Sequence, residues 1–107
     1  MDFSGRVGWR LLSANNRDLG RAAVAYPDSE SCLGAVRHLR RRLPDAMVVT
    51  SRDRLEYWTW SLRLDGTDVA MSSRHYQRRV QCEYASRLFL SLVLEAELTD
   101  SPPIGQP

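Results

Sequence analysis

The sequence contains no lysine, only two cysteines and only two histidines. All 15 basic side chains are therefore arginine, and 13 acidic residues leave a formal net charge of +2. Arginine offers a planar fork that binds phosphates and carboxylates and that stacks on aromatic rings. A general replacement of lysine by arginine, as GC-rich codons produce, explains the absence of lysine better than selection for nucleic-acid binding does.

Catalytic motifs are also absent. Cys32 and Cys82 show no CxxC or Cys/His spacing, which argues against a zinc site. His38 and His75 have no serine, cysteine or carboxylate beside them at motif spacing, and no P-loop, GxGxxG or HExxH occurs. We therefore expect no enzyme, no cofactor and no metal site.

Long hydrophobic runs are missing as well. The longest, "LFLSLVLEAEL" at residues 88–98, contains two glutamates and is far shorter than the roughly 20 residues that cross a bilayer. The first residues, "MDFSGRVGW", lack the apolar core of a signal peptide. We expect a cytoplasmic protein that makes no contact with membranes.

What the sequence does contain is a repeat, the signal that must be sought first because it determines the fold. The offset is 51 residues for the first two pairs of matching positions and 50 for the rest, and the extra residue falls in predicted hairpin loops, which absorb insertions. We predict one domain at residues 1–98, with repeats at about 7–53 and 54–98. Trp9, Leu11, Tyr26, Cys32 and Ala35 in the first repeat match Trp60, Leu62, Tyr76, Cys82 and Ala85 in the second.

Each repeat begins with a pattern typical of strands. In the second repeat, large apolar residues alternate with polar ones over residues 57–64, which is the period of a half-buried strand. Asp65 and Gly66 predict a tight turn into a second strand around residues 69–71. The first repeat has strands around residues 7–11 and 19–24. Whether Trp58 is exposed stays open, because the equivalent position in the first repeat is Val7.

After each tyrosine the apolar period changes to that of a helix. In the first repeat Cys32, Val36 and Leu39 fall on one stripe. Asp28 or Ser29 is expected to cap the helix start, and Pro44 to end the helix. The β-branched residues in "MVVT", residues 47–50, then predict a closing strand.

The second helix is harder to predict. Leucines at 88, 90, 92 and 94 alternate as they would in a strand, but leucine favours helices and the repeat requires a helix through Val93. Such a helix is apolar nearly all round, so it should be covered on more than one side. The cover is either a sheet together with a loop, or a second subunit in a homodimer formed through residues 88–98. Residues 99–107, "TDSPPIGQP", are predicted to be a disordered tail, because this Pro-rich segment has nothing to pack.

These features together resemble the YegP-like family of small domains of unknown function. The resemblance implies an α+β fold in which a tandem pair of β(3)-α-β repeats shares one antiparallel sheet, with two helices packed on one face and closing strands exchanged between repeats. It implies no activity and no catalytic residue. The matching residues include the W-x-L pairs (Trp9 and Leu11, Trp60 and Leu62), the turn residues Asn15, Asn16, Asp65 and Gly66, the aromatics Tyr26 and Tyr76, and the helical cysteines.

Both cysteines lie near the predicted start of a helix, where the helix dipole can lower a thiol pKa. They also lie on the apolar stripe, which favours buried packing, because free cysteine is among the most buried residue types. A cysteine-dependent redox protein is therefore the weakest of three functional hypotheses.

Arg74, Arg78 and Arg79 lie at or just before the predicted start of the second helix. A cation there opposes the helix dipole by about 0.3–1 kcal/mol. A bound anion, phosphate or nucleic acid would offset this cost, whereas pairing with Asp28 or Glu30, or solvation, would make a ligand unnecessary. Our first hypothesis is a non-catalytic interaction or structural protein with an unidentified partner, and the alternative is a nucleic-acid- or anion-binding module.

Overall fold

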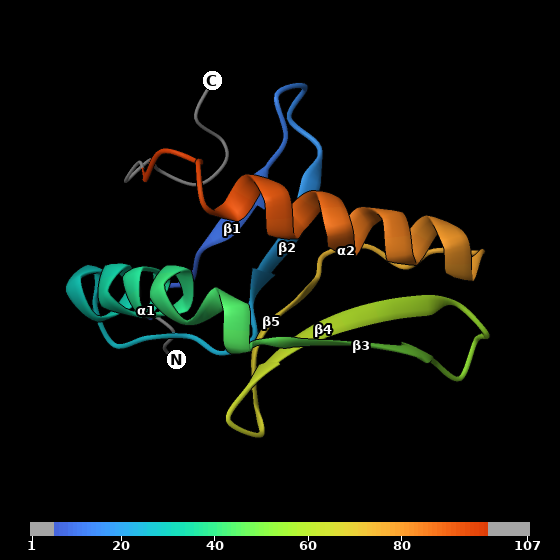
Figure 1. Cartoon of the computed structure of the whole chain (residues 1–107), viewed down its shortest axis with the longest axis horizontal. Helices are drawn as coiled ribbons and strands as arrows, with labels where there is room; N and C mark the ends of the chain where they lie inside the picture. The colour runs from blue at the N-terminus through green and yellow to red at the C-terminus, as the bar shows by residue number, and fades with distance from the viewer. Residues whose placement is uncertain (1–5, 99–107) are drawn as a thin grey trace.

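The computed structural model of the protein describes residues 6–98; the predicted tail at residues 99–107 lies outside the described residues. The described part confirms the α+β class, with strands before each helix (Figure 1). Its elements are β1 (Arg10–Leu12), β2 (Asp18–Ala22), α1 (Ser29–Arg42), a 3-10 turn (Leu43–Asp45), β3 (Met47–Arg52), β4 (Trp58–Leu64), β5 (Thr67–Ser72) and α2 (Arg79–Val93).

The strands form one antiparallel sheet in the order β1-β2-β5-β4-β3. At its centre β2 pairs with β5, and Arg21 lies opposite Met71. At one edge β3 pairs with β4 over its full length, from Met47 opposite Arg63 to Arg52 opposite Trp58. The other edge is β1, which pairs with β2. The predicted closing strand of the first repeat therefore lies beside the first strand of the second.

The strands before each helix differ in number from the predicted three. Within residues 6–98, two strands precede each helix, and each tyrosine makes only an isolated bridge to an earlier residue, Tyr26 to Val7 and Tyr76 to Trp58. The chain turns into the helix within three residues of each tyrosine, so a third ladder cannot extend. No strand follows α2 as far as Leu98.

Helix α1 starts as the sequence predicts. The carboxylate of Asp28 accepts a hydrogen bond of 2.7 Å from the backbone N–H of Ser31, so Asp28 is the N-cap rather than Ser29. The helix ends at Arg42 and passes into the 3-10 turn Leu43–Asp45, because Pro44 has no backbone N–H to continue the α-helical hydrogen bonds. Near this end, the half-buried Arg40 donates to the carbonyl oxygens of Val93, at 2.8 Å, and Ala96, which ties α1 to the end of α2.

Helix α2 runs to Val93, which confirms the helix over the strand reading. It lies across β2, β3 and β4, and its leucines at 88, 90 and 92 are partly buried against the core. The larger exposed leucines of this region are Leu94 and Leu98, which are 52% and 41% exposed. Of the two coverings that the sequence left open, the protein's own sheet contacts α2, and the leucines at 88, 90 and 92 are partly buried without a second subunit.

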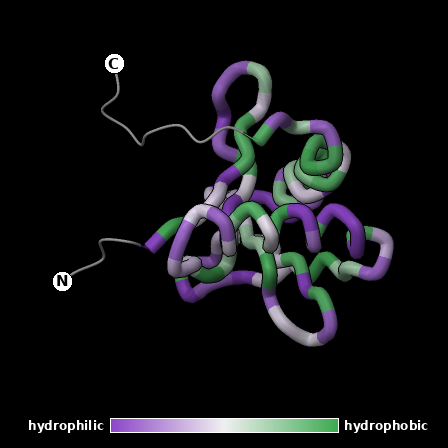
Figure 2. Tube along the Cα trace, turned by 90° about the vertical axis from the view of Figure 1, so that its left-hand side faces the viewer, coloured by the Kyte–Doolittle hydropathy of each residue, from purple (hydrophilic) through white to green (hydrophobic). Residues whose placement is uncertain are grey.

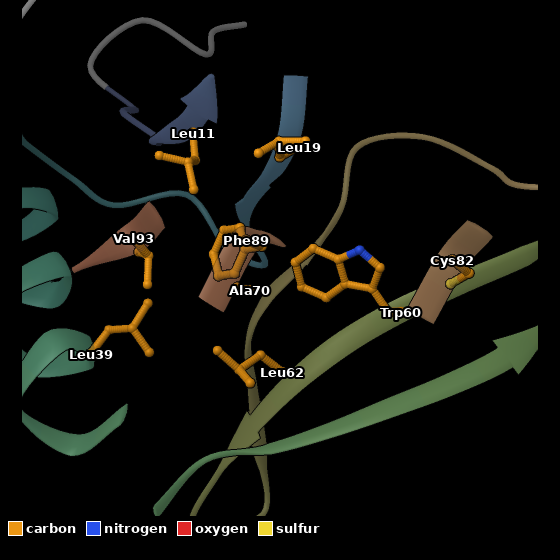
Figure 3. Packing of buried hydrophobic residues seen from close by; sticks show 9 residues of the cluster. All are labelled: Leu11, Leu19, Leu39, Trp60, Leu62, Ala70, Cys82, Phe89 and Val93. Atoms are coloured by element: carbon orange, nitrogen blue, oxygen red, sulfur yellow. The ribbon is translucent and has the colours of Figure 1, made fainter. Parts of the chain in front are cut away.

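The core cluster combines residues of four strands with Leu39 of α1 and with Cys82, Phe89 and Val93 of α2 (Figure 3). At its centre, the ring of Phe89 lies 4.8 Å from that of Trp60 and 6.1 Å from that of Trp9. These rings also contact β2, where a Cβ atom on Gly20 would lie 2.8 Å from both Phe89 and Trp60. The buried cluster consists of Leu11, Leu19, Leu39, Trp60, Leu62, Ala70, Cys82, Phe89 and Val93.

Hydrophobic and hydrophilic residues alternate over short distances along the chain (Figure 2). Among the described residues, no helix has the length and hydrophobicity that crossing a bilayer requires.

Candidate anion-binding surface

The end of the sheet and the start of α2 form one continuous surface. The loop between β3 and β4 lies beside the loop that leads into α2, because Trp58 and Tyr76 exchange backbone hydrogen bonds of 2.6 and 2.8 Å. His75 Nδ1 lies 2.9 Å from Asp53 Oδ2 and joins the two loops a second time. We call Arg52, Trp58, Arg74, Arg78 and Arg79 the arginine–tryptophan surface.

Trp58 is half-buried beneath two arginines. The guanidinium carbons of Arg52 and Arg79 each lie 5.3 Å from the centre of its ring, a distance at which the ring attracts a cation. Arg52 reaches the ring because it is the register partner of Trp58 across β3 and β4. The sequence left the exposure of Trp58 open; the ring is partly exposed, and two guanidinium groups lie over it.

Carboxylates partly neutralise both of these arginines. Arg79 Nε lies 3.0 Å from Glu83 Oε2, one helical turn further along α2, and Arg52 Nη2 lies 3.2 Å from Glu56 Oε1. The suggested pairing of the second-helix arginines with Asp28 or Glu30 is wrong: within residues 6–98 Arg79 pairs with Glu83, and the Asp28 carboxylate caps α1. Exposed pairs of this kind contribute only about 0–1 kcal/mol, so they leave the arginines free to exchange partners.

Arg74 and Arg78 are exposed and form no ion pair with any residue in the described range 6–98. Arg78 is the N-cap of α2, and its backbone N–H donates to Gln81 Oε1 at 3.3 Å. The first turn of α2 holds no acidic residue. The structure thus brings Arg78 and Arg79 together at the helix start, while Arg74 lies in the preceding loop without a hydrogen bond to either.

The two cysteines are packed in the interior as free thiols. Cys32 is 5% exposed and Cys82 is fully buried. Burial raises the pKa of both thiols, that of Cys82 to about 11 with a smaller contribution from the charge of Glu83. Because only the thiolate is a nucleophile, neither group is activated near neutral pH.

His75 and Asp53 look like an acid–base pair but serve the loop. Asp53 accepts hydrogen bonds of 2.9 Å from the backbone N–H groups of Leu55 and Tyr57. The hydrogen bond from the Tyr57 N–H lowers the pKa of Asp53 most, and the hydrogen bond with His75 lowers it further. The Asp53 carboxylate therefore ties the loop together through hydrogen bonds with Leu55, Tyr57 and His75.

His38 lies on a cavity of about 130 Å³ beneath α1. Ligand pockets have volumes of about 300–1,000 Å³, so this cavity is too small for a cofactor. Among residues 6–98 there is no group of three or more side chains that could hold a metal ion. The cavity is lined by Trp9, Tyr26, Ala35, His38, Leu39, Leu64 and Val69.

Sequence reasoning located Arg78 and Arg79 but missed Arg52. The prediction ended the closing strand at Thr50, two residues before the observed end of β3. Side chains of a strand alternate between its two faces, so a strand that continued to residue 52 would place Arg52 on the face of Val48 and Thr50. This alternation could have predicted the position of Arg52 from the sequence.

Comparison of the chain with family models, with curated proteins and with solved structures found no match.

Proposed function

We propose that the chain is a small, non-catalytic cytoplasmic interaction or structural protein, built as a tandem repeat of the YegP-like type. The β2–β5 pairing supports the repeat. Arg21 lies opposite Met71, its own equivalent at an offset of 50, and the neighbouring pairs, Gly20 with Ser72 and Ala22 with Ala70, exchange under the same offset. A two-fold relation between the halves requires this register.

Equivalent contacts elsewhere support the same relation. The backbone N–H of Cys32 donates to Asp28 O at 3.1 Å, and that of Cys82 donates to Arg78 O at 3.2 Å. Leu39 of α1 and Phe89 of α2, 50 residues apart, enter the same core cluster, as two helices on one face of the sheet would require. The pairing of β3 with β4 fits a closing strand exchanged between repeats.

The burial of the recurring residues carries the non-catalytic part of the proposal. Trp60, Leu62 and Cys82 are at most 2% exposed. The one reactive group among these three, the Cys82 thiol, is thus packed in the core, and burial keeps it protonated by raising its pKa to about 11. Thiol labelling of the folded protein tests this assignment, because a packed thiol reacts only after the chain opens.

A second candidate function, anion or nucleic-acid binding, is favoured by Arg74 and Arg78, which form no ion pair with any of residues 6–98. Arg52 and Arg79, held over Trp58, add two guanidinium groups whose positions are already restricted. A phosphate at this surface would meet arginine donors and the N–H groups of the first turn of α2, a turn that holds no acidic residue.

We expect the double variant Arg74→Glu/Arg78→Glu to bind a labelled mixed-sequence single-stranded oligonucleotide at least tenfold more weakly than the wild type at low salt. The slope of log affinity against log salt should fall by about 1.4, because each lost phosphate contact removes about 0.7 for single strands. Fluorescence anisotropy at several salt concentrations measures both quantities.

The matched control is Arg37→Glu/Arg41→Glu, which makes the same charge change at exposed positions on α1. It should retain most of the affinity. Absence of wild-type binding near physiological salt, or an equal loss in the control, would reject this surface as the binding site.

A further inference from the structure

The two edges of the sheet differ in how well they are protected. Exposed edges invite pairing with another strand, and proteins commonly prevent it with short strands, bulges, charges or proline. β1 has three residues, includes Arg10 and carries a register shift between Leu11 and Leu12. β3 has six residues in unbroken register with β4, contains no proline and has no charge before Arg52. Among the described residues, only β4 pairs with β3.

We infer that the free edge of β3 pairs antiparallel with β3 of a second copy, so that the two sheets become continuous across a two-fold axis. This inference names the partner of the interaction protein proposed above and rests on that proposal. It places the contact at the sheet edge rather than at α2.

The pleat of the sheet restricts the register. Val48 and Thr50 lie opposite Leu62 and Trp60, which places them on the buried face, whereas Met47, Val49 and Ser51 lie on the other face. Directly opposed residues in a continuous antiparallel sheet lie on the same face. At the two-fold axis a residue of β3 must therefore oppose its own copy, because an axis between consecutive residues would pair residues from different faces.

We place the axis at Val49, which pairs residues along nearly the whole length of β3. Val49 then opposes Val49 of the second copy, Met47 opposes Ser51, and Val48 opposes Thr50, and β-branched pairs of this kind stabilise antiparallel strands. Arg52 lies opposite Ala46 and stays on its own Trp58. An axis through Thr50 would instead place Arg52 opposite Val48, and an axis through Arg52 would set two like charges against each other.

Disulfide trapping tests both the dimer and its register. Directly opposed residues have Cβ atoms about 4.5–5.5 Å apart, close to the reach of a disulfide after a small shift. We expect Val49→Cys to form a covalent homodimer under mild oxidation. Met47→Cys is the matched control: Met47 is 64% exposed, yet its copies would lie two residues from the axis on either side and should not cross-link.

Sedimentation equilibrium of the untagged wild type provides the second measurement. We expect a concentration-dependent dimer that Val49→Lys abolishes, because it sets two charges against each other, and that Leu94→Lys leaves intact. Circular dichroism checks that both variants are folded.

A dimer lost in Leu94→Lys but not in Val49→Lys would overturn the inference in favour of α2. A wild type that stays monomeric at every concentration, or equal cross-linking of Met47→Cys, would also overturn it. These results leave the non-catalytic assignment standing, since thiol labelling of Cys32 and Cys82 decides that separately.

Discussion

Replacing Phe89 with alanine should lower the free energy of unfolding by about 3–5 kcal/mol, the range for a large aromatic removed from a core. Phe89 is fully buried, and its ring packs on both Trp60 and Trp9, so one substitution removes contacts from α2, β4 and the segment before β1. Small domains have a total stability of about 5–15 kcal/mol, so this loss is a large fraction of the whole.

Urea unfolding at equilibrium measures the effect, provided that the slope m stays constant. Tyr84→Ala is the control, because it removes an aromatic from the same helix at a position that is 62% exposed, and it should change stability by no more than about 0.5 kcal/mol. Similar losses in the two variants would contradict a core centred on Phe89.

Replacing Gly20 with alanine should lower stability by about 1–3 kcal/mol, the usual cost of overpacking a core. The new Cβ atom would lie 2.8 Å from the rings of Phe89 and Trp60, and neither ring has room to retreat because both are buried. This clash outweighs the roughly 0.5–1 kcal/mol that alanine gains over glycine in the middle of a strand.

Gly34→Ala provides a control of opposite sign. Gly34 lies in α1, where an added Cβ meets no atom within 4 Å, so the substitution should stabilise the protein by about 0.5–1 kcal/mol. Thermal or urea unfolding of the two variants side by side tests the pair. A stabilised Gly20→Ala variant would show that β2 does not pack against these rings.

Short sequence patterns predicted the helices and strands that neighbouring residues in the chain determine. Alternating residues predicted a strand where β4 lies, the Asp28 cap predicted the start of α1, and the repeat predicted that α2 reaches Val93 despite its alternating leucines. The strand ends were less predictable. Val7 makes only one bridge, to Tyr26, and whether a ladder extends past such a bridge depends on where the chain turns next.

Of the arginine–tryptophan surface, the sequence predicted only the arginines around the start of α2. Arg78 and Arg79 follow from where α2 begins, whereas the approach of Arg52 to Trp58 depends on the β3–β4 register. The leucines of α2 show the same limit: their pattern predicts a helix that needs covering, but not that β2, β3 and β4 cover it.

Thiol labelling of the native protein most directly tests whether the recurring residues serve packing rather than chemistry. An unstructured thiol titrates near about 8.5, whereas burial raises the pKa of Cys82 to about 11, so its thiolate stays scarce as the pH rises through the range in which a free cysteine becomes reactive. We expect Cys32 and Cys82 to react with a disulfide reagent only as fast as the chain unfolds, with the single variants Cys32→Ser and Cys82→Ser assigning each signal. Rapid labelling of Cys82 near neutral pH, while the protein remains folded, would contradict the packing role and restore the redox hypothesis.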